Sequence, residues 1–263
     1  MFPFQVLGFS APKATSSSVP VTARKTDETN IFEYLKWGGA KPKFDVLKKT
    51  QEYTSVFERT GGPPGPEWYD KDYVLRGGVI GPIILKDLRE TQGDFDLLTA
   101  FPDLIVTTFG HTIDPENPFR CFYFQKWRGT HTGTLMAGGQ AFEATGNYCE
   151  TPVSMFTAVW TPEEKIIYEQ VGSPIDRFEG TTKGKAAVFG LLHTAGLELP
   201  AAPGSLPLRF AQRIGHILGT GRSFSREEDI PAWWTSASRG ADATDWSMYE
   251  NQDLWIIRTK RCY

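Results

Sequence analysis

The spacing of apolar residues changes along the chain from helical to strand-like, and the change falls near residue 103. Residues 31–60 have helical spacing, with Asp45 placed to cap a helix that runs to about Arg59. A second helical stretch, interrupted at Gly93, is expected from about Pro82 to Leu98. Beyond it, β-branched and aromatic runs separated by turn formers predict strands near 103–110, 118–132, 147–160 and 164–175. Helices followed by strands indicate an α+β fold, with one antiparallel sheet packed on the helices.

The two ends of the chain differ from this middle. Residues 1–26 contain no Asp or Glu and are rich in Ser, Thr, Ala and Pro, as an organellar transit peptide is; an extended structural arm is the alternative. After a Pro/Gly linker, an amphipathic helix is expected at 208–218, and the tail beyond it carries Trp233, Trp234, Trp246 and Trp255. We therefore divide the chain into an N-terminal arm (1–30), one domain (31–200) and an aromatic-rich C-terminal extension (201–263).

Composition and motif searches exclude several classes of protein. The 263 residues are 40% hydrophobic and 22% charged, which is typical of a folded globular chain. A net charge of −3 argues against a nucleic-acid binder, and no apolar run approaches the roughly 18 residues of a transmembrane helix. The three cysteines and four histidines show no metal-ligand spacing, and no P-loop, dinucleotide fingerprint or nucleophile elbow occurs. We therefore expect neither a metal nor a cofactor.

The most informative segment is Trp-Arg-Gly-Thr-His-Thr-Gly at 127–133, which ends the strand predicted near 118–132. If no bulge intervenes, His131 shares one face of this strand with every second residue before it, namely Cys121, Tyr123, Gln125 and Trp127. A histidine between two threonines is also a common core residue, bonded to a neighbouring hydroxyl. The aromatic stripe on this strand likewise fits a core.

This segment resembles SnoaL-like polyketide cyclases of the nuclear-transport-factor-2-like (NTF2-like) superfamily. The resemblance covers about residues 66–196 and includes the helix end at 101–103 and the Lys165-Ile166 pair. It implies a cone, in which a strongly curved antiparallel sheet wraps around N-terminal helices and encloses a pocket. It also implies that no cofactor is needed.

The resemblance further implies a general acid/base on a late strand, with the histidine of the 127–133 segment nearby. The matching residues are Asp176 and His131. Alternation counted from Ile166 places Asp176 on the same strand face as Tyr168 and Gln170. The expected substrate contacts are Tyr123, Trp127, Tyr168 and Gln170. The alternative for Asp176 is a cap or a surface ion pair.

Two functions from different classes follow. The first is a cofactor-independent cyclase, dehydratase or isomerase acting on a small hydrophobic polyketide- or terpenoid-like compound, in which an apolar pocket raises the pKa of the catalytic carboxylate. The second is a non-catalytic NTF2-like scaffold subunit that joins an oligomer or a larger assembly through its terminal arms. The transit interpretation places that assembly in a plastid, and the alternative is the cytoplasm. An open interior containing both His131 and Asp176 would favour the enzyme.

Overall fold

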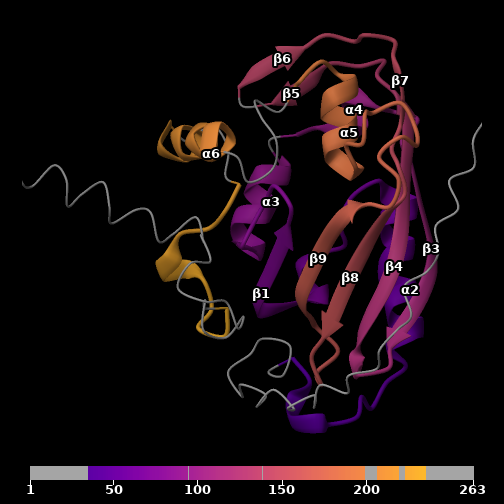
Figure 1. The fold of residues 1–263 in the computed structure, drawn as a ribbon, viewed down its shortest axis with the longest axis vertical. Coiled ribbons are helices and arrows are strands. Elements are labelled where there is room, and N and C mark those ends of the chain that lie inside the picture. The colour runs from indigo at the N-terminus through magenta and orange to yellow at the C-terminus, as the bar shows by residue number, and fades with distance from the viewer. Residues whose placement is uncertain (1–34, 94, 138, 199–205, 219–222, 235–263) are drawn as a thin grey trace, which may run out of the picture.

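The computed structural model describes residues 35–93, 95–137, 139–198, 206–218 and 223–234, and Figure 1 shows their arrangement. The arm predicted at 1–30, Trp246 and Trp255 lie outside these residues. The helices are α2 (Val46–Thr60), α3 (Leu85–Gly93), α4 (Leu97–Ala100), α5 (Ala187–Thr194) and α6 (Leu206–Leu218), with short 3-10 turns η1 (Trp37–Gly39), η2 (Pro66–Trp68) and η3 (Glu227–Asp229). The strands are β1 (Tyr69–Gly77), β2 (Ile83–Ile84), β3 (Ile105–Asp114), β4 (Asn117–Thr130), β5 (Leu135–Ala137), β6 (Gln140–Phe142), β7 (Tyr148–Glu150), β8 (Ser154–Trp160) and β9 (Ile166–Pro174).

Helix α2 forms where the sequence predicts it and covers the inner face of the sheet. Asp45 caps its start by accepting a hydrogen bond from the Lys48 amide, and Gly61 ends it in the left-handed conformation, at φ 65°. The helix packs on β3 and β4. Its buried stripe consists of Val46, Thr50, Tyr53 and Thr54. This packing carries the Tyr53 side chain into the interior of the domain.

The α+β fold class is confirmed, with a curved sheet packed against helices (Figure 1). The strand order in the main sheet is β2-β1-β9-β8-β4-β3, and β7 also pairs with β4. The four predicted strand regions pair antiparallel with one another, as expected. However, β1 was not predicted, and it pairs parallel with β9, so the sheet is mixed. The long crossover between β1 and β9 permits this parallel pairing, because the chain returns to the sheet in its original direction.

Two predicted element boundaries were wrong. The strand expected over 147–160 is split into β7 and β8, because Pro152 lies between them and proline has no amide to donate to the ladder. The helix expected from Pro82 to Leu98 starts later than predicted, because Ile83–Ile84 form β2, whereas its predicted interruption at Gly93 is confirmed by the end of α3. Asp96 starts the second helix, α4, by accepting a hydrogen bond from the Thr99 amide.

Strand β4 is the longest of the described strands, and its burial pattern shows which face of the sheet points inward. Over its fourteen residues, burial alternates strictly between fully and partly buried positions. The fully buried positions face the helices and include Phe119, Cys121, Tyr123, Gln125 and Trp127. The shared face predicted for this strand is therefore present.

The described part of the C-terminal extension packs on the outside of the domain. Helix α6 lies where the amphipathic stretch at 208–218 predicts one. The segment 223–234 runs along β1 and β2, where the Ser225 amide donates to the Pro82 carbonyl over 3.0 Å. Trp233 and Trp234 pack on Tyr168 of β9, with ring centroids 6.2 and 5.3 Å away. None of the described helices has the length and apolarity that crossing a membrane would require.

Candidate functional site

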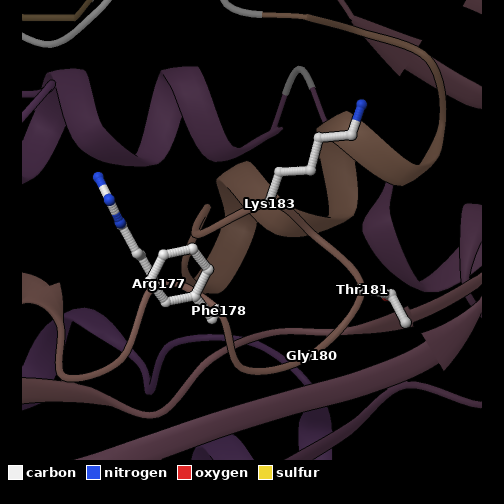
Figure 2. A pocket seen from close by; sticks show the side chains of 5 residues that line it. All are labelled: Arg177, Phe178, Gly180, Thr181 and Lys183. Carbon is white, nitrogen blue, oxygen red and sulfur yellow. The ribbon is translucent and has the colours of Figure 1, made fainter. Parts of the chain in front are cut away.

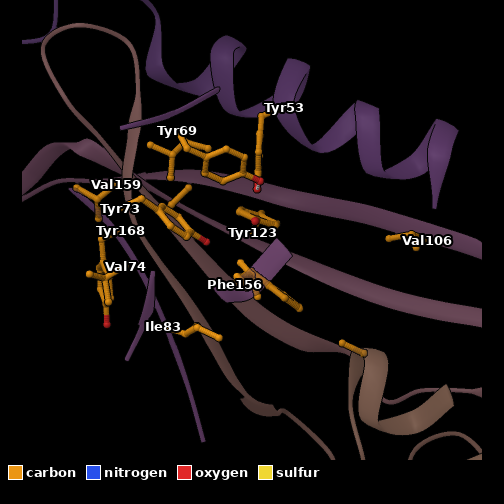
Figure 3. Close-up of a cluster of buried hydrophobic side chains, with 14 of the residues drawn as sticks. Tyr53, Tyr69, Tyr73, Val74, Ile83, Val106, Tyr123, Phe156, Val159 and Tyr168 are labelled. Atoms are coloured by element: carbon orange, nitrogen blue, oxygen red, sulfur yellow. Dashed lines mark hydrogen bonds between the residues drawn. The ribbon is translucent and has the colours of Figure 1, made fainter. Parts of the chain in front are cut away.

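A buried carboxylate, Glu169 of β9, lies in the interior between the sheet and α2. Two tyrosine hydroxyls donate to it, Tyr53 to Oε1 over 2.8 Å and Tyr73 to Oε2 over 2.6 Å. The Tyr53 hydroxyl also lies 2.9 Å from that of Tyr69, and Tyr123 of β4 adds a further hydrogen bond to the carboxylate. Figure 3 shows the four tyrosine side chains turned toward one another. We call Glu169, Tyr53, Tyr69, Tyr73 and Tyr123 the Glu169 cluster.

The Glu169 cluster is closed to solvent. Glu169 is 8% exposed, Tyr69 is 7%, and the other three tyrosines are at most 1% exposed. Three different elements supply the tyrosines: α2 carries Tyr53, β1 carries Tyr69 and Tyr73, and β4 carries Tyr123. The cluster therefore exists only in the folded domain, and both carboxylate oxygens are satisfied in it.

Burial sets the protonation state of this cluster. Desolvation raises the pKa of Glu169 above its ordinary value of 4.5, and the hydrogen bonds from the tyrosines oppose that rise. Desolvation and then the charge of Glu169 raise the pKa values of Tyr53, Tyr73 and Tyr123 well above 10. The hydroxyls therefore stay protonated as donors, and the carboxyl group of Glu169 keeps its proton to a higher pH than an exposed glutamate does.

A histidine lies beside the cluster. The His111 ring of β3 stacks on Tyr123, with centroids 5.5 Å apart, and its Nε2 lies 2.9 Å from the hydroxyl of Thr54. Burial lowers the pKa of His111 below 6.5, although the charge of Glu58 opposes this. The imidazole therefore links Tyr123, on which it stacks, to Thr54 of α2, with which it shares a hydrogen bond.

His131 is buried but lies far from this cluster. Glu169 pairs across the sheet with Ala158 of β8, and Ala158 with Cys121 of β4. His131 lies ten residues after Cys121, which at about 3.3 Å per residue is roughly 30 Å along the strand direction. The geometry therefore does not bring His131 to the Glu169 cluster.

The His131 ring is held as a neutral core histidine. Its Nδ1 accepts a hydrogen bond from the Thr145 amide over 3.2 Å, so the proton of the neutral ring is on Nε2. Nε2 is buried and has no hydrogen-bond partner among the described residues. The ring also lies 5.1 Å from that of Phe101, and burial lowers the pKa of His131 below 6.5. This arrangement matches the alternative of a core histidine bonded to a neighbouring threonine.

Asp176 lies on the surface. It follows the end of β9 in a bend, its side chain is exposed, and Oδ1 accepts a hydrogen bond from the Phe178 amide over 2.8 Å. A carboxylate that abstracts a proton from carbon needs apolar surroundings, which an exposed side chain lacks. The geometry favours a turn-forming role for Asp176, and its catalytic role stays a prediction for experiment.

The expected substrate contacts divide between the two faces of the sheet. Tyr123 and Trp127 face the interior. Tyr168 pairs with Val159 and Gln170 with Thr157, on the face opposite to Glu169 and Tyr123. Tyr168 is covered by Trp233 and Trp234, and Gln170 is exposed. These four residues therefore do not line one pocket.

Sequence reasoning missed Glu169 because it counted alternation on β9 from the wrong residue. The register with β8 shifts between Val159 and Trp160, so the inward positions on β9 are Glu169 and Val171. A signal was present: Glu169 is the only charged residue in the run Ile-Ile-Tyr-Glu-Gln-Val at 166–171. A lone charge in a strand of this kind marks either an outer face or a buried polar site.

Two further features of the surface and the interior bear on ligands. A hollow of about 410 Å³ is formed by one loop and lined by Arg177, Phe178, Gly180, Thr181 and Lys183 (Figure 2). Phe178 is 81% exposed there, and the Arg177 guanidinium lies 4.8 Å from its ring. In the part of the chain that the structure describes, no group of three or more His, Cys, Asp or Glu could hold a metal ion.

Comparison with known proteins supports a likeness of fold. No family model matches the sequence, and no curated protein matches it either. Among solved structures, a putative SnoaL-like polyketide cyclase from Jannaschia sp. CCS1 matches with 12% identity and a TM-score of 0.35, over 50% of this chain and 90% of its own. An NTF2-like protein of unknown function from Exiguobacterium sp. 255-15 matches with 11% identity and a TM-score of 0.28, over 49% of this chain and 91% of its own.

A steroid delta-isomerase from Pseudomonas aeruginosa gives 11% identity and a TM-score of 0.32, over 68% of this chain and 97% of its own. All three matches have low identity and low TM-scores. Likenesses with TM-scores of this size carry no argument about the site or the reaction.

Proposed function

We propose that this protein catalyses proton transfer at a carbon next to a carbonyl group, without a cofactor, and that Glu169 is the general base. The observation that carries the proposal is a carboxylate in an apolar interior with a tyrosine hydroxyl on each of its oxygens. Burial raises the pKa of this carboxyl group, which makes it a better proton acceptor than an exposed one. In this proposal Glu169 takes the role that the resemblance to cyclases implied for Asp176.

The reaction has two halves that these residues serve. Glu169 accepts the proton from the substrate carbon, and the electron pair of the broken C–H bond moves into an enolate whose charge rests on the carbonyl oxygen. Tyr53 and Tyr73, which donate to Glu169 in the closed cluster, donate to that oxygen instead. Return of the proton from Glu169 to another carbon is an isomerisation. Attack of the enolate on a second carbonyl carbon, whose oxygen then takes the proton back from Glu169, is a cyclisation.

The aromatic lining of the interior favours a small hydrophobic substrate, of the polyketide- or terpenoid-like class. Around the cluster the interior is aromatic: Trp160 and Phe57 pack on Tyr53, and Phe156 stacks on Tyr123. Because the cluster is closed, turnover requires an opening that admits substrate to Glu169. The β1–β9 ladder is interrupted beside Tyr73, which is the natural place for such an opening.

The test is deuterium exchange at carbon. Small aromatic ketones and 1,3-dicarbonyl compounds are incubated with the protein in D₂O, and α-deuteration is followed by NMR. Glu169→Gln should lower the rate by about 10²–10⁴-fold, the range of general-base catalysis. Asp176→Asn is the matched control and should leave it unchanged. Loss of exchange in Asp176→Asn alone would restore the original assignment.

A second candidate is a non-catalytic scaffold subunit, and an exposed apolar patch on the outer sheet face favours it. Phe109 of β3 lies 5.7 Å from Phe124 of β4, and Met155 of β8 pairs with Phe124. Phe109 is 43% and Met155 40% exposed. Such a patch is typical of protein interfaces. In this alternative the assembly lies in a plastid if residues 1–26 are a transit peptide.

The scaffold alternative is tested by mass in solution. A defined oligomer that Phe109→Asp dissociates, together with no carbonyl compound deuterated above the buffer rate, would support it. A monomer that deuterates substrate would refute it.

A further inference from the structure

The strand that carries Tyr73 is irregular at that point. Tyr69 of β1 pairs with Ile166 of β9, and Val74 pairs with Tyr168, so five steps on β1 match two on β9. Residues 70–73 therefore form a wide bulge. Tyr73 ends this bulge and reaches inward to Glu169 over 2.6 Å. A bulge frees its backbone from the ladder, so its shape must be fixed by other groups.

Side chains satisfy the backbone of the bulge at Asp72. The Asp72 amide donates to Oδ1 of Asp70 over 2.9 Å. The Asp72 carbonyl accepts a hydrogen bond from the indole Nε1 of Trp233, also over 2.9 Å. Trp233 lies 161 residues further along the chain, on the C-terminal extension. The residue just before Tyr73 is thus held from outside the domain.

The tryptophan pair is itself anchored firmly. Trp233 and Trp234 are each 7% exposed and pack on Tyr168, which precedes Glu169 and faces the opposite side of the sheet. Upstream, the Ser225 hydroxyl accepts a hydrogen bond from the Ile84 amide over 2.9 Å. The segment therefore spans β1, β2 and β9 on their outer side and ends beside the bulge.

We propose that Trp233 is a positioning residue for the Glu169 cluster: its indole N–H fixes the bulge of β1 that carries Tyr73 to the carboxylate. This inference rests on the proposed function for its catalytic meaning. Its structural content stands on the two hydrogen bonds, Trp233 to Asp72 and Tyr73 to Glu169. Through them the C-terminal extension controls both the donor set of Glu169 and the opening of the β1–β9 ladder.

The protonation of Glu169 reports on this coupling. The groups facing Glu169 are Tyr53 from α2, Tyr69 and Tyr73 from β1, and Tyr123 from β4, while Arg89 of α3 lies over the Tyr69 ring, 5.7 Å from its centroid. The hydrogen bond from Tyr73 lowers the pKa of Glu169. Displacing Tyr73 must therefore raise that pKa further.

The experiment uses the full-length Trp233→Phe variant, which keeps an aromatic ring but loses the N–H donor. Hydrogen–deuterium exchange is measured for the peptide that contains residues 70–74. Glu169 is titrated by infrared spectroscopy, through the protonated-carboxyl band that disappears in Glu169→Gln. We expect exchange about tenfold faster and a titration midpoint higher by about one pH unit, the size of a lost hydrogen bond to a charged group.

The matched control is Trp234→Phe, which makes the same ring change one residue along against the same Tyr168. It should match wild type in both readouts. If Trp233→Phe does not fold, Ser225→Ala loosens the same segment while keeping both tryptophans, and the same two shifts are expected. Wild-type exchange and a wild-type titration midpoint in folded Trp233→Phe, or in Ser225→Ala where that variant replaces it, would overturn the proposal. Neither readout needs a substrate, so an inactive protein with both shifts refutes the proposed reaction alone.

Discussion

Replacing Glu169 by Gln should stabilise the folded protein increasingly as the pH rises. The amide has nearly the shape of the carboxylate and can still accept from Tyr53 while donating to the Tyr73 hydroxyl. It removes only the charge that must be buried on folding. The prediction is therefore about a pH dependence and not about a lost contact.

The sign follows from linkage. Desolvation raises the pKa of Glu169 in the folded state above its ordinary value of 4.5. Between these two pKa values the native state binds more protons than the unfolded chain, so wild-type stability falls as the pH rises. The slope is about 1.4 kcal/mol per pH unit. This loss of stability begins as the pH rises past the ordinary pKa of a glutamate, and it ends once the pH passes the pKa of Glu169 in the folded state.

Urea unfolding of wild type and Glu169→Gln between pH 4.5 and 8 measures this slope directly. The lowered pKa values of His111 and His131 have the opposite effect on stability. Below pH 6.5 the unfolded chain binds protons at these histidines more readily than the native protein does, so the native protein loses stability as the pH falls. Both histidines are present in both proteins, so they cancel in the difference curve. Glu52→Gln, on the exposed side of α2, is the control for removing a carboxylate. A difference curve for Glu169→Gln no steeper than that of the control would refute the reasoning.

Three further outcomes check the packing around the site. In a Cys262→Ser background, Cys121 and Cys149 should react with a thiol reagent only on unfolding, because both are fully buried and burial raises their pKa values; rapid labelling of the native protein would contradict this. Gly180→Ala should cost roughly 2–5 kcal/mol in chemical denaturation, because φ is +74° and the new Cβ overlaps the Glu150 carbonyl. Gly139→Ala, with φ +77° but open space, should cost about 1–2 kcal/mol, and equal losses would be the contrary result. Asp45→Ala should remove about 1 kcal/mol by uncapping α2, whereas an unchanged melting temperature would show that the cap is redundant.

The sequence predicts those elements whose local signals agree with their packing. Asp45 marks the start of α2, and the alternation along β4 marks a strand with one buried face. Strand β1 escaped prediction because Asp70, Lys71 and Asp72 interrupt its apolar pattern. Those residues form the bulge, whose backbone is completed by Trp233 from the other end of the chain. No local pattern can report a contact of that range.

The residues of the candidate site were also difficult to predict from local sequence patterns. Period-2 counting assigns faces correctly only while the ladder is regular, and a single register shift exchanges every inward and outward residue of a strand. The shift beside Trp160 sends Tyr168 and Gln170 outward and Glu169 inward. The resemblance to cyclases directed attention to the end of β9, where Asp176 is exposed, and not to Glu169 within the strand.

Energetics give Glu169 its significance. Burying a carboxylate is costly even when it is hydrogen-bonded, and an apolar residue of similar volume often makes a more stable core. Here the cost extends to four tyrosines whose hydroxyls must also be satisfied, and to a bulge in β1 that brings Tyr73 to the carboxylate. A fold with so many aromatic side chains could fill this space without a charge. This cost is consistent with our proposal that Glu169 acts as a general base, and the slope of the Glu169→Gln difference curve measures how much stability the buried charge costs.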